Sequence, residues 1–130
     1  MSIPKVLVAD PISERGIAEL AEGKLLKVDV MTGKSEQELL AIIGEYQGLV
    51  VRSQTKVTAK LLEAATNLKV VGRAGVGVDN VDVPAATKRG VLVVNSPEGN
   101  TIAAAEQALA LMLALSRHVP HAHASTMAGG

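Results

Sequence analysis

The sequence lacks cysteine, tryptophan and phenylalanine, and Tyr46 is its single aromatic residue. Without cysteine the chain has neither disulfide bonds nor thiolate metal ligands. With one aromatic ring, its core must be built from aliphatic side chains, and it cannot sandwich a flavin between rings. The 13 acidic and 13 basic residues cancel in charge, so no basic face indicates a nucleic-acid partner.

Long hydrophobic runs are also missing. The first residues, MSIPKVLVAD, contain only a short apolar stretch, unlike a signal peptide. No apolar stretch reaches the ~18 residues of a membrane-spanning helix. With 130 residues, 48% of them hydrophobic, the sequence predicts a cytoplasmic protein that has enough apolar surface for a core and no membrane partner.

Short β-branched apolar runs alternate with helix-like segments along most of the chain. This alternation predicts a parallel sheet with right-handed crossovers and helices on both faces. We expect an α/β, doubly wound, flavodoxin-like fold with five strands in the order 2-1-3-4-5. The expected strands are residues 5–9, 26–30, 48–51, 68–72 and 91–94. The expected helices are residues 13–21, 35–44, 58–65 and 81–88. Ser35 and Glu38 have the spacing of a capping box.

The segment IAAAEQALALMLAL, which starts at Ile102, is apolar on almost every side. A helix in the outer layer of a sheet normally keeps one polar stripe. This segment is therefore either well buried or a contact surface, and exposed apolar patches of this size usually mark contacts. We divide the chain into a lobe (residues 1–100), an apolar helix (101–118), folded back on the sheet or at a dimer interface, and a loose tail (119–130).

Polar residues and glycines follow several of the expected strands. In open α/β sheets, ligands bind beyond the carboxyl ends of the strands. The residues expected there are Asp10, Arg52, Ser53, Gln54, Arg73, Ala74, Gly75, Val76, Gly77, Asn95, Ser96, Glu98, Gly99 and Asn100. Guanidinium groups and backbone N–H groups made accessible by glycine suit a carboxylate or phosphate. The sequence therefore predicts a site for a small anion.

Several of these residues also have a structural interpretation. Arg73 is expected to pair with an acidic neighbour such as Asp79 or Asp82. Asp10 stands before a proline, as is typical of a turn or cap residue. Asn95 and Asn100 are of the type found in Asx turns and at helix N-caps.

The run GVGVDN resembles a dinucleotide-binding loop in its glycine spacing. That fingerprint reads G-x-G-x-x-G and has an acidic residue ~20 positions further on. Gly75 and Gly77 fit, but Asn80 takes the third glycine's place, and the next strand ends in Asn95 rather than an acid. We therefore reject this run as a pyrophosphate site.

Other chemistries found on such folds lack their residues. A phosphoacceptor aspartate would stand after the third strand, where the chain has Arg52. The three histidines, His118, His121 and His123, all lie at the end of the expected apolar helix or in the tail, so no Ser–His–Asp arrangement is expected. They have no acidic or sulfur partner nearby, and we expect no metal site.

The runs VVRSQTKVT and VVGRAGVGVDNVDVPAATKRGVLVVNSPEGNTIAAAEQALALMLALSRHVP are similar to those of the D-3-phosphoglycerate dehydrogenases. This group belongs to the family of NAD-dependent D-2-hydroxyacid dehydrogenases, and the resemblance covers nearly the whole chain. It implies a parent reaction in serine biosynthesis, the NAD-dependent oxidation of 3-phosphoglycerate to 3-phosphohydroxypyruvate. It also implies that the fold described above is the substrate-binding lobe.

The resemblance implies roles for particular residues. The substrate-binding positions that it implies are Arg52, Ser53, Ala74, Gly75, Val76 and Asn100. Val76 also lines the nicotinamide side, which makes it the one cofactor-binding position implied. The segment Thr101–Arg117 matches a helix that packs with the NAD-binding domain of the family and helps to form its dimer.

The family's pattern continues beyond MAGG, where its G-x-G-x-x-G would begin. The family's catalytic arginine, glutamate and histidine have no counterpart in the 130 residues. We therefore expect these residues to hold no cofactor and to be catalytically inactive alone. Two alternatives stay open: a self-sufficient flavodoxin-like domain with a structural or interaction role, and a chain that keeps residual NAD-dependent activity. For Thr101–Arg117 we favour folding back on the sheet, with a homodimer through any remaining apolar face.

Overall fold

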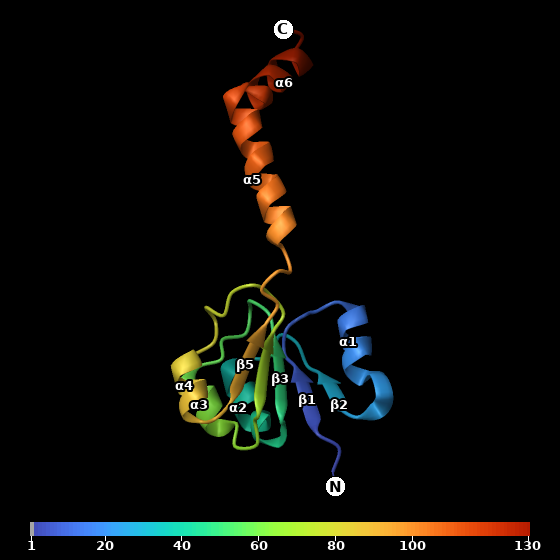
Figure 1. Cartoon of the computed structure of the whole chain (residues 1–130), viewed down its shortest axis with the longest axis vertical. Coiled ribbons are helices and arrows are strands. Elements are labelled where there is room, and N and C mark those ends of the chain that lie inside the picture. Colours follow the sequence, from blue (N-terminus) through green and yellow to red (C-terminus); the bar gives the residue numbers. More distant parts are fainter. Residues whose placement is uncertain (1) are drawn as a thin grey trace. The chain divides into compact units, whose positions relative to one another are not determined.

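The computed structural model describes residues 2–130. The chain divides after Pro97 into two compact units, close to the boundary expected at residue 100. The first unit contains the sheet, and the second contains two helices (Figure 1).

The first unit is built on a five-stranded sheet in which every neighbouring pair is parallel. Its strands are β1 (Lys5–Val8), β2 (Lys27–Val30), β3 (Gly48–Val51), β4 (Val70–Arg73) and β5 (Leu92–Asn95). They lie in the order β2-β1-β3-β4-β5. The predicted fold class and strand order are therefore confirmed.

Four helices connect these strands, and each begins at a side-chain cap. The helices are α1 (Glu14–Ala21), α2 (Glu36–Ile42), α3 (Ala59–Ala64) and α4 (Val83–Lys88), with short 3₁₀ turns η1 (Glu22–Lys24) and η2 (Ile43–Glu45). The capping residues are Ser13, Ser35, Thr58 and Asp82. The capping box predicted for α2 is confirmed, since Ser35 and Glu38 each accept a hydrogen bond from the other's backbone N–H, at 3.3 and 2.8 Å.

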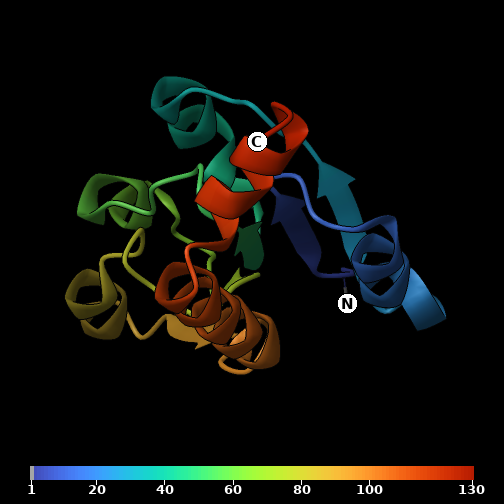
Figure 2. The same cartoon turned by 90° about the horizontal axis from the view of Figure 1, so that it is seen from above.

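The helices cover the sheet unequally. Figure 2 shows α1 on one side of the sheet and α2, α3 and α4 on the other, as right-handed crossovers require for this strand order. The main core lies under the three helices and includes Leu7, Leu49, Val51, Val71, Leu39, Leu61, Leu62 and Ala86. Alternate strand residues face α1, and there an apolar groove of about 300 Å³ includes Val6, Val50, Val70, Val94 and Leu20. Helices thus lie on both faces, as predicted.

The second unit consists of α5 (Thr101–Ser116) and α6 (Val119–Met127). The expected apolar helix is present as α5, and none of its residues is buried. More than half of each large apolar side chain is exposed at Ile102, Leu109, Leu111, Met112, Leu113 and Leu115. Asn100 stands at the N-cap of α5, but its side chain makes no capping hydrogen bond. The predicted N-cap position of Asn100 is therefore confirmed, although its side chain does not bond to the helix.

Helix α6 occupies most of the segment for which the sequence predicts a loose tail. It follows His118, whose backbone is left-handed with φ 50°. Pro120 lies in the first turn of α6, where its fixed φ suits a helix and its missing N–H costs no hydrogen bond. Proline thus starts a helix here and does not mark irregular chain. Among residues 2–130, no helix has the length and apolar character needed to cross a membrane.

Candidate functional site

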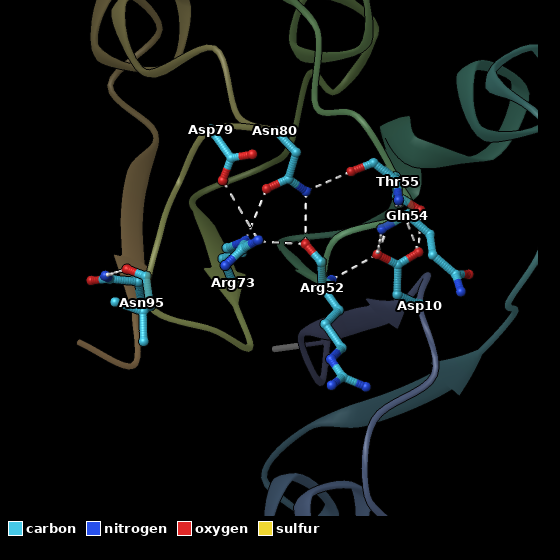
Figure 3. A network of polar contacts seen from close by, with 9 residues as sticks. Asp10, Arg52, Gln54, Thr55, Arg73, Asp79, Asn80 and Asn95 are labelled. Carbon is cyan, nitrogen blue, oxygen red and sulfur yellow. Dashed lines mark hydrogen bonds and ion pairs between the residues drawn. The ribbon is translucent and has the colours of Figure 1, made fainter. Parts of the chain in front are cut away.

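The carboxyl ends of four neighbouring strands bring polar residues to one edge of the sheet (Figure 3). Asp10 follows β1 and Arg52 follows β3, while Arg73 and Asn95 end β4 and β5. The strand register places Arg73 beside Asn95. The parallel sheet thus gathers residues that lie far apart in the sequence.

The carboxylate of Asp10 organises the loop that follows β3. Its side chain is only 1% exposed. It accepts hydrogen bonds from the backbone N–H groups of Arg52, Gln54 and Thr55, the shortest for each residue being 2.7, 3.1 and 3.0 Å. The hydroxyl of Thr55 donates a further bond of 2.6 Å. Burial raises the pKa of Asp10, but these hydrogen bonds more than offset it and hold the pKa below its usual range.

The prediction that Asp10 is a turn or cap residue is therefore wrong. A cap or turn residue bonds to backbone groups within a few positions, whereas the partners of Asp10 lie 42 to 45 positions away. The signal available in the sequence was an ionisable residue placed directly after a buried strand. Its partners become visible only once β1 and β3 lie side by side.

Asn80 is a second organiser of the same loop. Its side-chain nitrogen donates to the carbonyl oxygens of Arg52 and Thr55, both at 2.7 Å. Its side-chain oxygen accepts from Nε of Arg73 at 2.9 Å, and the same Nε lies 3.2 Å from the carbonyl oxygen of Arg52. Nη2 of Arg73 is 3.6 Å from Oδ1 of Asp79, which confirms the predicted acidic neighbour.

In the sequence, Asn80 stands out only as the residue that replaces the third glycine of the G-x-G-x-x-G pattern. That mismatch was the signal, because an asparagine side chain there can tie the β4 loop to the β3 loop, which a glycine cannot do. A side chain on Gly75 would collide with the guanidinium group of Arg73. The glycine thus leaves room for Arg73 to reach Asn80.

The side chain of Arg52 takes no part in this backbone network. It is exposed and, within residues 2–130, makes no hydrogen bond or ion pair. Figure 3 shows it pointing away from Asp10 and Asn80. Its planar guanidinium group offers five N–H donors, a geometry that matches carboxylate and phosphate.

Ser53 is also exposed, but its surroundings are less suited to an anion. It lines a hollow of about 600 Å³ together with Lys56, Asp79 and Asp82. Two carboxylates and one ammonium group do not favour a phosphate there. Arg52 is therefore the better anion-binding candidate of the two.

The glycine loop after β4 is held through its carbonyl groups. Nδ2 of Asn95 donates to the carbonyl oxygen of Val76 at 2.5 Å. The backbone N–H of Ser96 donates to the carbonyl oxygen of Gly75 at 3.0 Å. Asn95 therefore ties β5 to this loop, and the prediction of a local Asx turn for it is wrong.

The first four N–H groups of this loop, those of residues 74–77, fall into two pairs. Those of Ala74 and Gly75 donate to carbonyl oxygens of β3 and β4, at 2.8 and 2.9 Å. Those of Val76 and Gly77 donate to no group in the described part of the chain. The side chain of Val76 is 41% exposed. Of these four residues, Val76 and Gly77 are therefore the two with backbone donors available to an anion.

The loop does not fit the pyrophosphate of a dinucleotide. A pyrophosphate needs unpaired N–H groups at the start of the following helix. Here the Asp82 carboxylate caps α4 and accepts the N–H of Ala85 at 3.0 Å, which places a negative charge at that end. Among residues 2–130, no group of three His, Asp or Glu side chains is arranged to hold a metal ion.

Asn100, the remaining expected site residue, lies in the second unit at the start of α5. It is exposed. The other residues that the family resemblance implies for the site all lie in the first unit.

The family model described as "D-isomer specific 2-hydroxyacid dehydrogenase, catalytic domain" matches residues 6–128. The chain belongs to this family. It is 57% identical to the D-3-phosphoglycerate dehydrogenase of Synechocystis sp., over 95% of the chain and 22% of that enzyme. It is 55% identical to the D-3-phosphoglycerate dehydrogenase of Archaeoglobus fulgidus, over 96% of the chain and 24% of that enzyme. The chain thus spans about a quarter of the length of these curated relatives.

Solved structures show the same fold. A protein from Pyrococcus horikoshii matches with a TM-score of 0.81 and 34% identity, over 92% of this chain and 35% of its own. The NAD⁺-bound 3-phosphoglycerate dehydrogenase of Entamoeba histolytica matches with a TM-score of 0.74 and 28% identity, over 87% of this chain and 39% of its own. The predicted family resemblance is therefore confirmed.

Proposed function

We propose that this chain is the substrate-binding lobe of a D-3-phosphoglycerate dehydrogenase, which acts in the cytoplasm in serine biosynthesis. One observation carries the proposal. The Arg52 guanidinium group and the N–H groups of Val76 and Gly77 follow neighbouring strands, and none of them has a partner in the described residues. These are anion-binding groups, and the curated relatives described above are named for an anionic substrate, 3-phosphoglycerate.

Each predicted site residue of the first unit has a place in this proposal. The substrate carboxylate accepts hydrogen bonds from Val76 and Gly77, and Arg52 balances the negative charge of the substrate. Ala74 and Gly75 shape the loop, because their own N–H groups are already used. The exposed apolar side chain of Val76 faces the nicotinamide of an NAD molecule that other residues hold. The exposed hydroxyl of Ser53 supplies at most a hydrogen bond at the rim of the site, because Asp79 and Asp82 lie beside it.

We propose that the 130 residues alone do not catalyse the oxidation. Hydride transfer needs a bound nicotinamide and an acid–base group for the hydroxyl proton. The glycine loop does not fit a pyrophosphate, and the three histidines of the chain lie between residues 118 and 123, in the second unit. An absorbance assay for NADH with NAD and 3-phosphoglycerate should therefore show no turnover. Measurable turnover would contradict this part of the proposal.

An amide titration by NMR tests the binding role. Added 3-phosphoglycerate should shift the amide signals of Arg52, Val76 and Gly77, and glycerol, which carries no charge, should not. Arg52→Gln should weaken the response, while Arg89→Gln, which removes an exposed arginine at the end of α4, should not. If millimolar 3-phosphoglycerate causes no shifts, the alternative of a flavodoxin-like structural or interaction domain is favoured.

We also propose that Thr101–Arg117 covers its apolar side chains, either on the sheet of its own chain or against a second copy of it. The exposure of six large apolar side chains on α5 supports this proposal. Light scattering over a range of concentrations tests the homodimer. A strict monomer at high concentration would remove the dimer from the proposal.

A further inference from the structure

The loop Arg52–Thr55 lies between two side chains that hold opposite sides of its backbone. Asp10 accepts hydrogen bonds from the backbone N–H groups of the loop, and Asn80 donates hydrogen bonds to the carbonyl groups of the loop. We propose that Asp10 and Asn80 are positioning residues that fix this loop, and thereby the base of the Arg52 side chain, before any ligand binds. This inference rests on the proposed binding role of Arg52.

The Asp10 side of the arrangement depends on an ionised carboxylate. Its two oxygens accept from three backbone N–H groups and one hydroxyl. An asparagine of the same shape would lose the charge and turn an N–H₂ group toward donors. A buried carboxylate without these donors would in turn be costly. The loop and Asp10 therefore hold each other in place.

The Asn80 side depends on a correctly oriented amide. The N–H₂ group has two donors, and both are used, on the first and last carbonyl groups of the loop. The bond from Arg73 to the amide oxygen sets this orientation, because a flipped amide would place its N–H₂ against the guanidinium group. In an aspartate at position 80, a carboxylate oxygen would replace this N–H₂ group and would repel the two carbonyl oxygens. The hydrogen bonds therefore require asparagine.

Together the two side chains fix Arg52 at both its N–H and its carbonyl group while its side chain remains exposed. Exposed loops are otherwise mobile, and ordering them on binding costs affinity. Through its bond with Arg73, Asn80 also joins the two ends of the loop that contains Val76 and Gly77. It therefore sets the spacing between the β3 and β4 loops, whose donors would contact one anion.

Two near-isosteric variants test this inference, Asp10→Asn and the double variant Asp79→Asn/Asn80→Asp. The double variant keeps the wild-type net charge, so that it isolates the hydrogen bonds of Asn80. Asp79→Asn alone is the control, since Asp79 is exposed and its ion pair with Arg73 is long, at 3.6 Å. Amide titration with 3-phosphoglycerate should show binding weakened about tenfold or more in both test variants. The control should stay within about twofold.

A second readout needs no ligand. Amide hydrogen exchange of Arg52, Gln54 and Thr55, the three residues that donate to Asp10, should accelerate in both test variants, while exchange in β1 and β3 stays slow. If Asp10→Asn does not fold, Thr55→Val replaces it, because it removes only the hydroxyl bond of 2.6 Å. If Asp10 and Asn80 only stabilised the fold and did not position the loop, the folded fraction of each variant would bind 3-phosphoglycerate with unchanged affinity.

The results separate this inference from the proposed function. No binding by the wild type contradicts the proposed function, and loop exchange then decides whether Asp10 and Asn80 hold the loop. Normal affinity in both test variants would overturn the inference even if the loop became mobile. Weaker binding with unchanged loop exchange would also overturn it, since the residues would then not act through the loop.

Discussion

The two units of the chain contain similar aliphatic residues but use them differently. In the first unit, the aliphatic side chains of the parallel strands are buried under α2, α3 and α4. In the second, neither α5 nor α6 has a buried residue. An apolar composition therefore does not by itself make a core, because each apolar face also needs a second surface. In the first unit, the sheet and its helices supply surfaces for each other. The helices of the second unit need a further surface to pack against, because isolated helices are only marginally stable in water.

The largest expected difference between the units concerns truncated leucines. Leu62→Ala in α3, where the side chain is 0% exposed, should lower the free energy of unfolding by about 2–5 kcal/mol. Leu113→Ala in α5, where it is 59% exposed, should cost less than about 0.5 kcal/mol in dilute solution. Urea denaturation followed by the fluorescence of Tyr46 measures both. Equal costs would remove this contrast and would favour the other arrangement proposed for Thr101–Arg117, in which α5 folds back on the sheet of its own chain.

A smaller difference is expected when single hydroxyl groups are removed. The Tyr46 hydroxyl donates to Asp29 at 3.0 Å from a side chain that is 4% exposed, so Tyr46→Phe should cost about 1 kcal/mol. Ser116→Ala removes an exposed bond of 3.0 Å to Leu113 in α5 and should cost close to nothing. Circular dichroism during urea unfolding suits both variants, since Tyr46→Phe removes the tyrosine fluorescence. If Ser116→Ala lowered the free energy of unfolding as much as Tyr46→Phe does, the expected difference between the two units would be contradicted.

The smallest expected effect on the free energy of unfolding comes from the ionisation of Tyr46, because it changes stability only at high pH. Burial, followed by the hydrogen bond to Asp29, raises the pKa of Tyr46 to about 12. Below the unfolded pKa of about 10, this contribution to stability is constant. Between these two values the unfolded chain loses its proton first, so stability falls as the pH rises. Absorbance of tyrosinate reports Tyr46 alone, because the chain has one tyrosine, and ionisation near pH 10 in the folded chain would contradict the buried contact.

The topology was predictable because it depends on repeated local patterns. Buried parallel strands appear as apolar runs, and their alternation with helices leaves few ways to order a five-stranded sheet. The capping box of α2 and the pairing of Arg73 with Asp79 were predictable for the same reason, since the partners lie within a few residues of each other.

The hydrogen bonds of the site were not predictable in this way. Asp10 and Asn95 looked like local turn or cap residues, but their side chains bond to other strands' loops. Such partners depend on the register of the sheet, which no local pattern reveals. Helix α6 was missed for a different reason. Pro120 breaks the interior of a helix but suits its first turn, and the sequence does not show which position it takes.

The most direct test is a crystal structure of the chain grown with saturating 3-phosphoglycerate. We predict that the ligand carboxylate accepts hydrogen bonds from the N–H groups of Val76 and Gly77, with the guanidinium group of Arg52 on the same anion. A ligand ordered elsewhere, for example in the hollow beside Lys56, or an empty sheet edge, would contradict the proposal that this edge is half of a substrate site.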